Sequence, residues 1–398
     1  MTINKKTRAI AACLVVILIL TYLSGCDTST STDNPPNAVD RKDGLYINGL
    51  YVDMSVQETG SYFYDQLTDS EKTMYTASLI ALQSGNNVYE LVGVDCDEYV
   101  DGCKRSTEAL LRDHPEIFWI DGGNRVRSTW LEENTVGSVE ITLSIHRYWE
   151  GKDIQRAQEE LDLAVSELLT ETDAFDTPYE KAKFLNGWLA EHIEYDRDSL
   201  DFPSNMDNAD KAFANTMYGA LVARKTLCGG YAATFSYILN HCGIKAIYVT
   251  GSTVDGLHAW NLVELGGEFY HIDTTWADDN NKDGVLYSYF GLDEEEMSLT
   301  HTKDDLFDYP DALGVEYDYF RREGLYLEAY SFNKYNAIFS KNYSGGEFSV
   351  KFPSEVVLRA AVKDIIENSK FYKLDGMSDA GVFSYVVDDI HCILTLYP

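Results

Sequence analysis

The sequence has no CxxC pair and no closely spaced histidines, so it lacks the patterns typical of a zinc site. It is also poor in basic side chains, with 32 Lys and Arg against 65 Asp and Glu and a formal net charge of −33. A surface with that charge repels nucleic acid and anionic lipid head groups. We therefore expect no nucleic-acid partner.

What the chain does contain is enough material for several hydrophobic cores. It has 398 residues, of which 45% are hydrophobic and 13% aromatic, including 28 tyrosines. That composition excludes a disordered protein and predicts two or three folded domains.

The first 25 residues resemble an export signal. Lys5, Lys6 and Arg8 precede an apolar stretch over 9–22 that is short for a transmembrane span. The following "LSGC" resembles a bacterial lipobox, in which the cysteine, here Cys26, is lipidated and becomes the first residue of the mature chain. An uncleaved anchor is the alternative, and either interpretation predicts an extracytoplasmic protein held at the cell membrane.

Domain boundaries follow from composition and periodicity. Residues 26–45 are rich in Ser, Thr, Asn, Asp and Pro and predict a flexible tether after the signal peptide of residues 1–25. We expect helices at 62–85 and from 106 to the residue before Pro115, a short aromatic strand after it, and a strand at 138–148. These predict an N-terminal α+β domain over 46–150.

The remaining chain predicts a central domain over 151–330 and a small α/β appendage over 341–398. Helical spacing of apolar residues is found at 153–171, 177–196 and 231–239, and strand patterns lie at 245–251, 258–265 and 268–276. For the appendage, the sequence predicts a strand, a helix and two further strands.

Five cysteines remain after Cys13 and Cys26 are set aside. Cys96 and Cys103 are close enough in sequence to form a disulfide, which the sequence leaves open. Cys242 and Cys392 have apolar neighbours and are expected to be inert.

Two strands of the central domain bring candidate catalytic groups onto one face. If Gly266 and Gly267 form the two-residue loop of a hairpin, Trp260 lies opposite Asp273. His258 and Asp273 are then diagonal neighbours, roughly 7 to 8 Å apart at the backbone, which is within reach of an imidazole and a carboxylate. A general base and the acid that orients it need this arrangement.

Cys228 would be the third member. It comes directly before Gly229, Gly230 and an apolar helical run, where the positive end of the helix dipole favours a thiolate. The glycines would leave room for a substrate carbonyl, and the backbone N–H of Cys228 is a natural oxyanion donor. Tyr218 is a candidate for the second donor.

Each residue also has a plainer interpretation. His258 could be a hydrogen-bonded core histidine, Asp273 a turn former and Cys228 a small buried hydrophobe. The aromatic residues that could wall a cleft could equally be ordinary core residues; they are Tyr231, Trp260, Tyr270 and Trp276.

The order of the three residues resembles the transglutaminase-like superfamily of papain-related folds. The carrying stretches are "YGALVARKTLC", "LCGGYAATFSYILNHCGIKAIYVTG" and "HAWNLVELGGEFYHIDTTWAD". In that family the cysteine opens the central helix, the histidine lies in an H-A-W-N strand and the acid precedes T-W; Cys228, His258 and Asp273 match these positions. The resemblance covers about 176–280 and indicates a bacterial secreted lipoprotein member. Gly229 departs from it, since many relatives have an acidic residue there.

The resemblance implies an α+β fold with a papain-like core, in which the helix bearing the nucleophile packs on an antiparallel sheet. It implies acyl transfer through a Cys-His-Asp triad, acting on carboxamide or peptide bonds of a protein or peptide substrate at the cell surface. A cell-wall or surface cysteine peptidase and a non-catalytic binding or scaffold module are the alternatives. We expect no cofactor and no metal, because "DDNNKDG" at 278–284 lacks the Glu that an EF-hand loop requires.

Overall fold

The computed structural model describes residues 41–54, 61–130, 136–200, 212–278, 284–378 and 381–398. The expected signal peptide, Cys26 and most of the expected tether lie outside these residues. All elements below belong to one compact unit, Asp43–Pro398. No helix among the described residues has the length and apolar character that crossing a membrane requires.

The first part of this unit is an antiparallel five-stranded sheet with two helices. Its strand order is β2-β1-β3-β5-β4. The strands are β1 (Gly44–Ile47), β2 (Leu50–Val52), β3 (Val88–Asp95), β4 (Ile120–Trp130) and β5 (Val136–Ile145), and the helices are α2 (Asp69–Gln83) and α3 (Cys96–Asp113).

Three sequence expectations for this part were wrong in their bounds. Helix α2 begins at Asp69 and not at residue 62, because the Thr68 side chain accepts a hydrogen bond from the Glu71 N–H and caps the helix. Helix α3 begins ten residues before the expected position, because the Asp95 side chain accepts hydrogen bonds from the backbone of Asp97 and Glu98 and so caps it. The aromatic residues expected as a strand after Pro115 form a turn instead, and the strand starts only at Ile120.

Cys96 and Cys103 lie in the same helix and are both free thiols. Both are buried, and burial raises the pKa of Cys103 to about 11. The disulfide that the sequence left open is therefore not formed.

The central part combines helices with a second antiparallel sheet of order β11-β10-β9-β8-β12. Its strands are β8 (Ala246–Thr253), β9 (Gly256–Leu265), β10 (Glu268–Ile272), β11 (Phe290–Leu292) and β12 (Thr302–Lys303). Its main helices are α4 (Ile154–Thr172), α5 (Pro178–His192) and α8 (Cys228–His241), joined by the shorter α6 (Arg197–Leu200), η6 (Gly219–Ala223), α9 (Glu294–Met297) and α10 (Tyr319–Arg322). The short strands β6 (Glu194–Tyr195) and β7 (Lys225–Thr226) pair in parallel.

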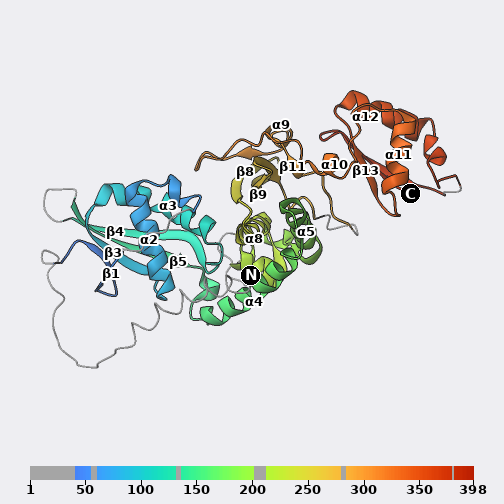
Figure 1. The fold of residues 1–398 in the computed structure, drawn as a ribbon. Coiled ribbons are helices and arrows are strands. Elements are labelled where there is room, and N and C mark those ends of the chain that lie inside the picture. Colours follow the sequence, from blue (N-terminus) through green and yellow to red (C-terminus); the bar gives the residue numbers. More distant parts are fainter. Residues whose placement is uncertain (1–40, 55–60, 131–135, 201–211, 279–283, 379–380) are drawn as a thin grey trace, which may run out of the picture. The chain divides into compact units, whose positions relative to one another are not determined.

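Both faces of the central sheet are covered, which places its residues in a dry environment. Helix α8 contacts β8 and β9 and lies beside them in Figure 1. Phe235 and Ile238 of α8 share a core with Val263 of β9. Ile247 and Trp260, on the opposite face, belong to the core formed with α2, α3 and the first sheet.

The β9–β10 hairpin has the predicted register. Leu265 pairs with Glu268 and Asn261 with Ile272, so paired positions follow the expected two-residue loop. Gly266 and Gly267 have φ values of 64° and 92°, which glycine adopts without strain.

The last part is a three-stranded antiparallel sheet with helices. It contains β13 (Phe348–Lys351), β14 (Ser384–Asp388) and β15 (Ile393–Tyr397), with α11 (Phe332–Asn342), α12 (Glu355–Val362), η7 (Lys363–Glu367) and η8 (Lys370–Lys373). Its core also takes in Leu327, Tyr335 and Phe339, which precede the expected start at residue 341, because α11 packs its apolar side on the sheet.

Candidate active site

Cys228 is the first residue of α8. Leu227 precedes it with an extended backbone and supplies no side-chain cap. The N–H groups of Gly230 and Tyr231 donate to the Leu227 carbonyl, so the N–H of Cys228 itself is the donor beside the sulfur. The Cys228 side chain is half-buried, whereas the two residues after it are buried. The thiol is therefore at the one position of this helix start that keeps access to solvent.

The two glycines serve packing, which differs from their expected role of leaving room for a substrate. A Cβ on Gly230 would lie 2.1 Å from Thr226 Oγ1 and 2.7 Å from the backbone oxygen of Thr216. A Cβ on Gly229 would meet the Asn215 side chain at 2.8 Å, and the Gly229 N–H donates a 3.2 Å hydrogen bond to Asn215 Oδ1. The first turn of α8 thus packs directly against the preceding segment.

The β9–β10 hairpin brings His258 and Asp273 together. His258 lies in β9 and Asp273 directly follows β10, and His258 Nε2 lies 2.7 Å from Asp273 Oδ2. Both side chains are buried. The diagonal contact expected from the hairpin register is therefore present.

The Asp273 carboxylate has four hydrogen-bond donors around it. Its Oδ1 accepts from the backbone N–H of Thr275 at 2.9 Å and of Trp276 at 3.3 Å. Its Oδ2 faces His258 and also His301, whose Nε2 lies 3.2 Å away. The bonds from Thr275 and Trp276 end the strand at Ile272, so Asp273 is both a turn former and the partner of His258.

These contacts determine the charges of Asp273 and His258. Burial alone would raise the pKa of Asp273, but the charge and hydrogen bond of His258, together with His301, hold it below its ordinary value. Burial would lower the pKa of His258, but Asp273 and then Cys228 outweigh burial and raise it well above its ordinary value. The stable form of the pair is an imidazolium beside a carboxylate.

Cys228 interacts with the same imidazole. A side-chain hydrogen bond from Cys228 is among the causes that raise the pKa of His258. Since Nε2 is directed to Asp273, Nδ1 is the ring nitrogen left for the sulfur. Burial raises the pKa of Tyr195 to about 12, and the charge of Cys228 contributes to this rise.

His301 was missed in the sequence, although one signal for it exists. It lies between α9 and β12, and β12 pairs with β8 through Thr302 to Ser252 and Lys303 to Gly251. A Cβ on Gly251 would lie 2.0 Å from the Thr302 backbone oxygen. An isolated glycine within a strand pattern, as in "IYVTGST", indicates such a close backbone approach.

Aromatic rings enclose this cluster. The Trp276 ring is tilted against both histidines, with ring centroids 5.6 Å from His258 and 4.5 Å from His301. Trp260 lies 5.0 Å from His301, and Tyr289 5.5 Å. Trp276 is half-buried and belongs to this enclosure, whereas three of the four aromatics considered in the sequence are core residues, namely Tyr231, Trp260 and Tyr270.

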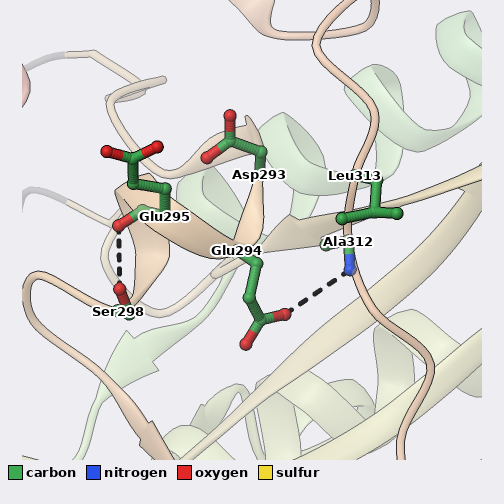
Figure 2. A pocket seen from close by; sticks show the side chains of 6 residues that line it. All are labelled: Asp293, Glu294, Glu295, Ser298, Ala312 and Leu313. Carbon is green, nitrogen blue, oxygen red and sulfur yellow. Dashed lines mark hydrogen bonds between the residues drawn. The ribbon is translucent and has the colours of Figure 1, made fainter.

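A second chain of hydrogen bonds links Trp260 to Glu294 through His271. Trp260 Nε1 donates to His271 Nδ1 at 3.0 Å, and His271 Nε2 lies 3.1 Å from Glu294 Oε2. Figure 2 shows Glu294 beside Ala312, whose backbone N–H it accepts, in a pocket that Asp293 and Glu295 also line. Glu294 thus orients Trp260 through its hydrogen bond to His271.

Among the described residues, one group has the atom types that bind transition metals. The ligand-type atoms of His258, Asp273 and His301 all lie within 4.8 Å of one another. Each of these atoms already takes part in a hydrogen bond within the group, and those bonds account for the arrangement.

Tyr218 does not serve as expected. Its hydroxyl donates a 3.0 Å hydrogen bond to Glu160 Oε2, and its ring stacks on Phe118. Burial and this bond raise the pKa of Tyr218 to about 12. The side chain is therefore engaged with α4 and is not available as an oxyanion donor.

Comparison with known proteins agrees with this geometry. Residues 167–274 match the family model described as the transglutaminase-like superfamily. They form a transglutaminase-like domain. It contains Cys228, His258 and Asp273, whereas His301 lies beyond the matched residues. The expected fold class, α+β with a transglutaminase-like core, is confirmed, and a domain of this kind indicates an enzyme.

Two curated relatives resemble part of this chain. Human kyphoscoliosis peptidase is 31% identical over 157 residues, which are 36% of this chain and 22% of the relative. The mouse protein of the same name is 29% identical over 153 residues, which are 35% and 22%. This chain thus spans about a fifth of the length of these relatives. A crystal structure of a TGase matches 41% of this chain and 48% of its own, with 18% identity and a TM-score of 0.28.

Proposed function

We propose that the protein is a cysteine acyl-transfer enzyme in which Cys228 is the nucleophile. The observation that carries the proposal is the 2.7 Å contact between His258 Nε2 and Asp273 Oδ2, made by an imidazole whose pKa Cys228 also raises. A nucleophile, its base and an orienting acid in this order are what covalent acyl transfer needs.

The first half-reaction starts from the Cys228 thiolate and the His258 imidazolium. The sulfur attacks the carbonyl carbon of a carboxamide or peptide bond, and a C–S bond forms while the carbonyl π electrons move to oxygen. The backbone N–H of Cys228 stabilises that oxyanion. The oxyanion then collapses, the C–N bond breaks, and His258 Nδ1 gives its proton to the departing amine.

The second half-reaction resolves the thioester. Water or a primary amine attacks the carbonyl carbon while the neutral His258 takes the proton of the attacking group. The C–S bond breaks and the thiolate returns beside the imidazolium. Throughout, Asp273 remains ionised and holds the ring with Nδ1 toward the sulfur.

The acceptor decides between hydrolysis and crosslinking. The curated relatives are named peptidases, which supports testing water as the acceptor first. An amine acceptor would make the protein a crosslinking transglutaminase. We propose that the substrate in either case is a protein or peptide at the cell surface.

We also propose that the chain is exported and anchored to the membrane through lipid on Cys26. The basic residues, the apolar stretch and "LSGC" at 23–26 support this. Expression of the wild type and of Cys26→Ala, followed by phase separation in detergent, tests it. The anchor proposal fails if both forms stay in the aqueous phase.

The activity test uses the full-length protein in detergent, incubated with a biotinylated primary amine and a glutamine-containing protein. Mass spectrometry of the same mixtures detects new peptide termini, which would report hydrolysis. We expect one of the two products in the wild type and in the matched control Cys242→Ala, and none in Cys228→Ala. Equal products from Cys228→Ala would exclude this thiol as the nucleophile, and a scaffold role predicts no product from any form.

A further inference from the structure

The second histidine on Asp273 is a residue that the acyl-transfer chemistry does not itself require. His301 Nε2 lies 3.2 Å from Asp273 Oδ2, the same oxygen that His258 Nε2 approaches to 2.7 Å. The two imidazole centroids are 5.2 Å apart. The side chain of His301 is 1% exposed, so it cannot touch a substrate bound at Cys228.

The surroundings of His301 favour a neutral ring. Burial lowers the pKa of His301 despite the attraction of Asp273, and the positive charge of His258 acts in the same direction. The other titratable groups facing it are Tyr289, in ring contact, His271, and His391, which also lowers its pKa. A carboxylate between two histidines therefore carries one imidazolium, and that imidazolium is His258.

The tautomer of His301 is fixed by Asp273. An ionised carboxylate oxygen can only accept a hydrogen bond, so the proton of the neutral ring is on Nε2, which lies 3.2 Å from Asp273 Oδ2. Nδ1 is then an acceptor, and Thr300 Oγ1 lies 2.8 Å from it. His301 is then a donor without a charge.

We propose that His301 is a positioning residue that acts through Asp273: as a neutral second donor to Oδ2, it fixes the carboxylate and weakens its hold on the proton of His258. This inference rests on the proposed acyl-transfer function. Its physical basis is that a carboxylate which accepts one more hydrogen bond is a weaker base. His258 can then release its proton to the departing amine more easily than it could beside a carboxylate with one donor fewer.

The test measures His258 directly in the free protein. The full-length protein, labelled with 15N at histidine, is titrated by NMR, and the His258 signals are identified by their loss in His258→Gln. His301→Leu removes the donor, and we expect the His258 midpoint to rise by about one pH unit. His301→Gln keeps an N–H at this position and should restore the midpoint most of the way.

A matched control and a second route keep the outcome decisive. His114→Gln changes another histidine paired with an acid, Glu116 at 2.8 Å, and should leave the His258 midpoint unchanged. If His301→Leu does not fold, Thr300→Val replaces it, since loss of the hydroxyl removes the contact with His301 Nδ1 that helps to orient the ring, and should raise the midpoint by a smaller amount. An unchanged midpoint in a folded His301→Leu, or in Thr300→Val where it substitutes, overturns the proposal.

A parallel measurement separates this inference from the proposed function. Alkylation of Cys228 by iodoacetamide reports whether the thiol is activated, independently of the His258 titration. Slow alkylation in the wild type would argue against the acyl-transfer function, while the NMR midpoints would still decide the role of His301. Rapid alkylation in the wild type, together with an unchanged His258 midpoint in His301→Leu, would reject the role proposed for His301 and leave the acyl-transfer function standing.

Discussion

His258 Nε2 and Asp273 Oδ2 lie 2.7 Å apart, and this contact assigns the two nitrogens of the imidazole to different tasks. Nε2 faces the acid, so Nδ1 is left for the proton exchanged with Cys228. The acid is buried and ionised, which fixes the ring by charge as well as by direction. Several measurable consequences depend on this ion pair and on the packing around it.

Cys228 should be alkylated at a lower pH than the other cysteines. His258 is held as an imidazolium beside it, whereas burial raises the pKa of Cys242. We expect iodoacetamide at pH 6 to modify Cys228 about tenfold faster than Cys242 or more. Peptide mapping by mass spectrometry measures both sites in one sample. Equal rates at the two cysteines would remove the case for an activated nucleophile.

Asp273→Asn should lower kcat strongly. The amide cannot hold the imidazolium by charge, and loss of the comparable acid in a serine protease triad costs about 10⁴-fold. We expect kcat to fall by about 10²- to 10⁴-fold. Iodoacetamide should still alkylate Cys228 in the variant, which controls for misfolding.

The same pair should contribute to stability within a defined pH window. The raised pKa of His258 gives stability that is complete below about pH 6.5 and is lost as pH rises through the folded value. The lowered pKa of Asp273 gives stability that is complete above about pH 4 and is lost as pH falls. The difference in unfolding free energy between the wild type and Asp273→Asn, from urea titrations, should therefore peak between these limits. A difference that does not vary with pH would contradict the ion pair.

Gly230→Ala should destabilise the protein more than Gly229→Ala does. The new Cβ at 230 would lie 2.7 Å from the Thr216 backbone oxygen, which cannot move without shifting the chain, and even closer to Thr226. At 229 the closest atoms belong to the exposed Asn215 side chain, which can turn away. Overpacking of this kind costs about 1 to 3 kcal/mol. Thermal melts of the two variants make the comparison, and the opposite order would contradict it.

Lys351→Met should be strongly destabilising. The Lys351 ammonium is 2% exposed and lies 2.8 Å from carboxylate oxygens of both Asp318 and Glu296. Its loss leaves Asp318 buried without a counter-charge, at a cost of about 3 to 5 kcal/mol. Urea unfolding measures the loss. Adding Asp318→Asn keeps an oxygen that accepts the Arg321 N–H, so the double variant should regain part of the lost unfolding free energy. If it regains none, loss of packing is the cause of the destabilisation.

The hairpin and the acid–base contact could be predicted because they depend on local rules. Gly266 and Gly267 define a two-residue loop, and the period of two along each strand then places His258 and Asp273 on one face. The start of α8 is equally local. No long-range contact has to be known for any of these.

His301 and the start of α3 were not predicted, for different reasons. His301 reaches Asp273 only because β12 pairs with β8, and the sequence does not reveal which distant segments pair. At α3 the acidic residues and Gly102 weaken the helical pattern, yet Gly102 is needed where a Cβ would lie 2.9 Å from Glu71. Tertiary packing overrides local preference there.

The order of elements along the chain bears on how this centre is made. Cys228, His258, Asp273 and His301 follow one another in a stretch built from helix α8 and neighbouring antiparallel strands, and the first sheet, α4 and α5 are encoded before them. Short loop closures of this kind cost little entropy and occur early. A nascent chain that has emerged beyond β12 (Thr302–Lys303) therefore already holds these four side chains and the strand that positions His301, and the C-terminal part then adds His391 beside His301.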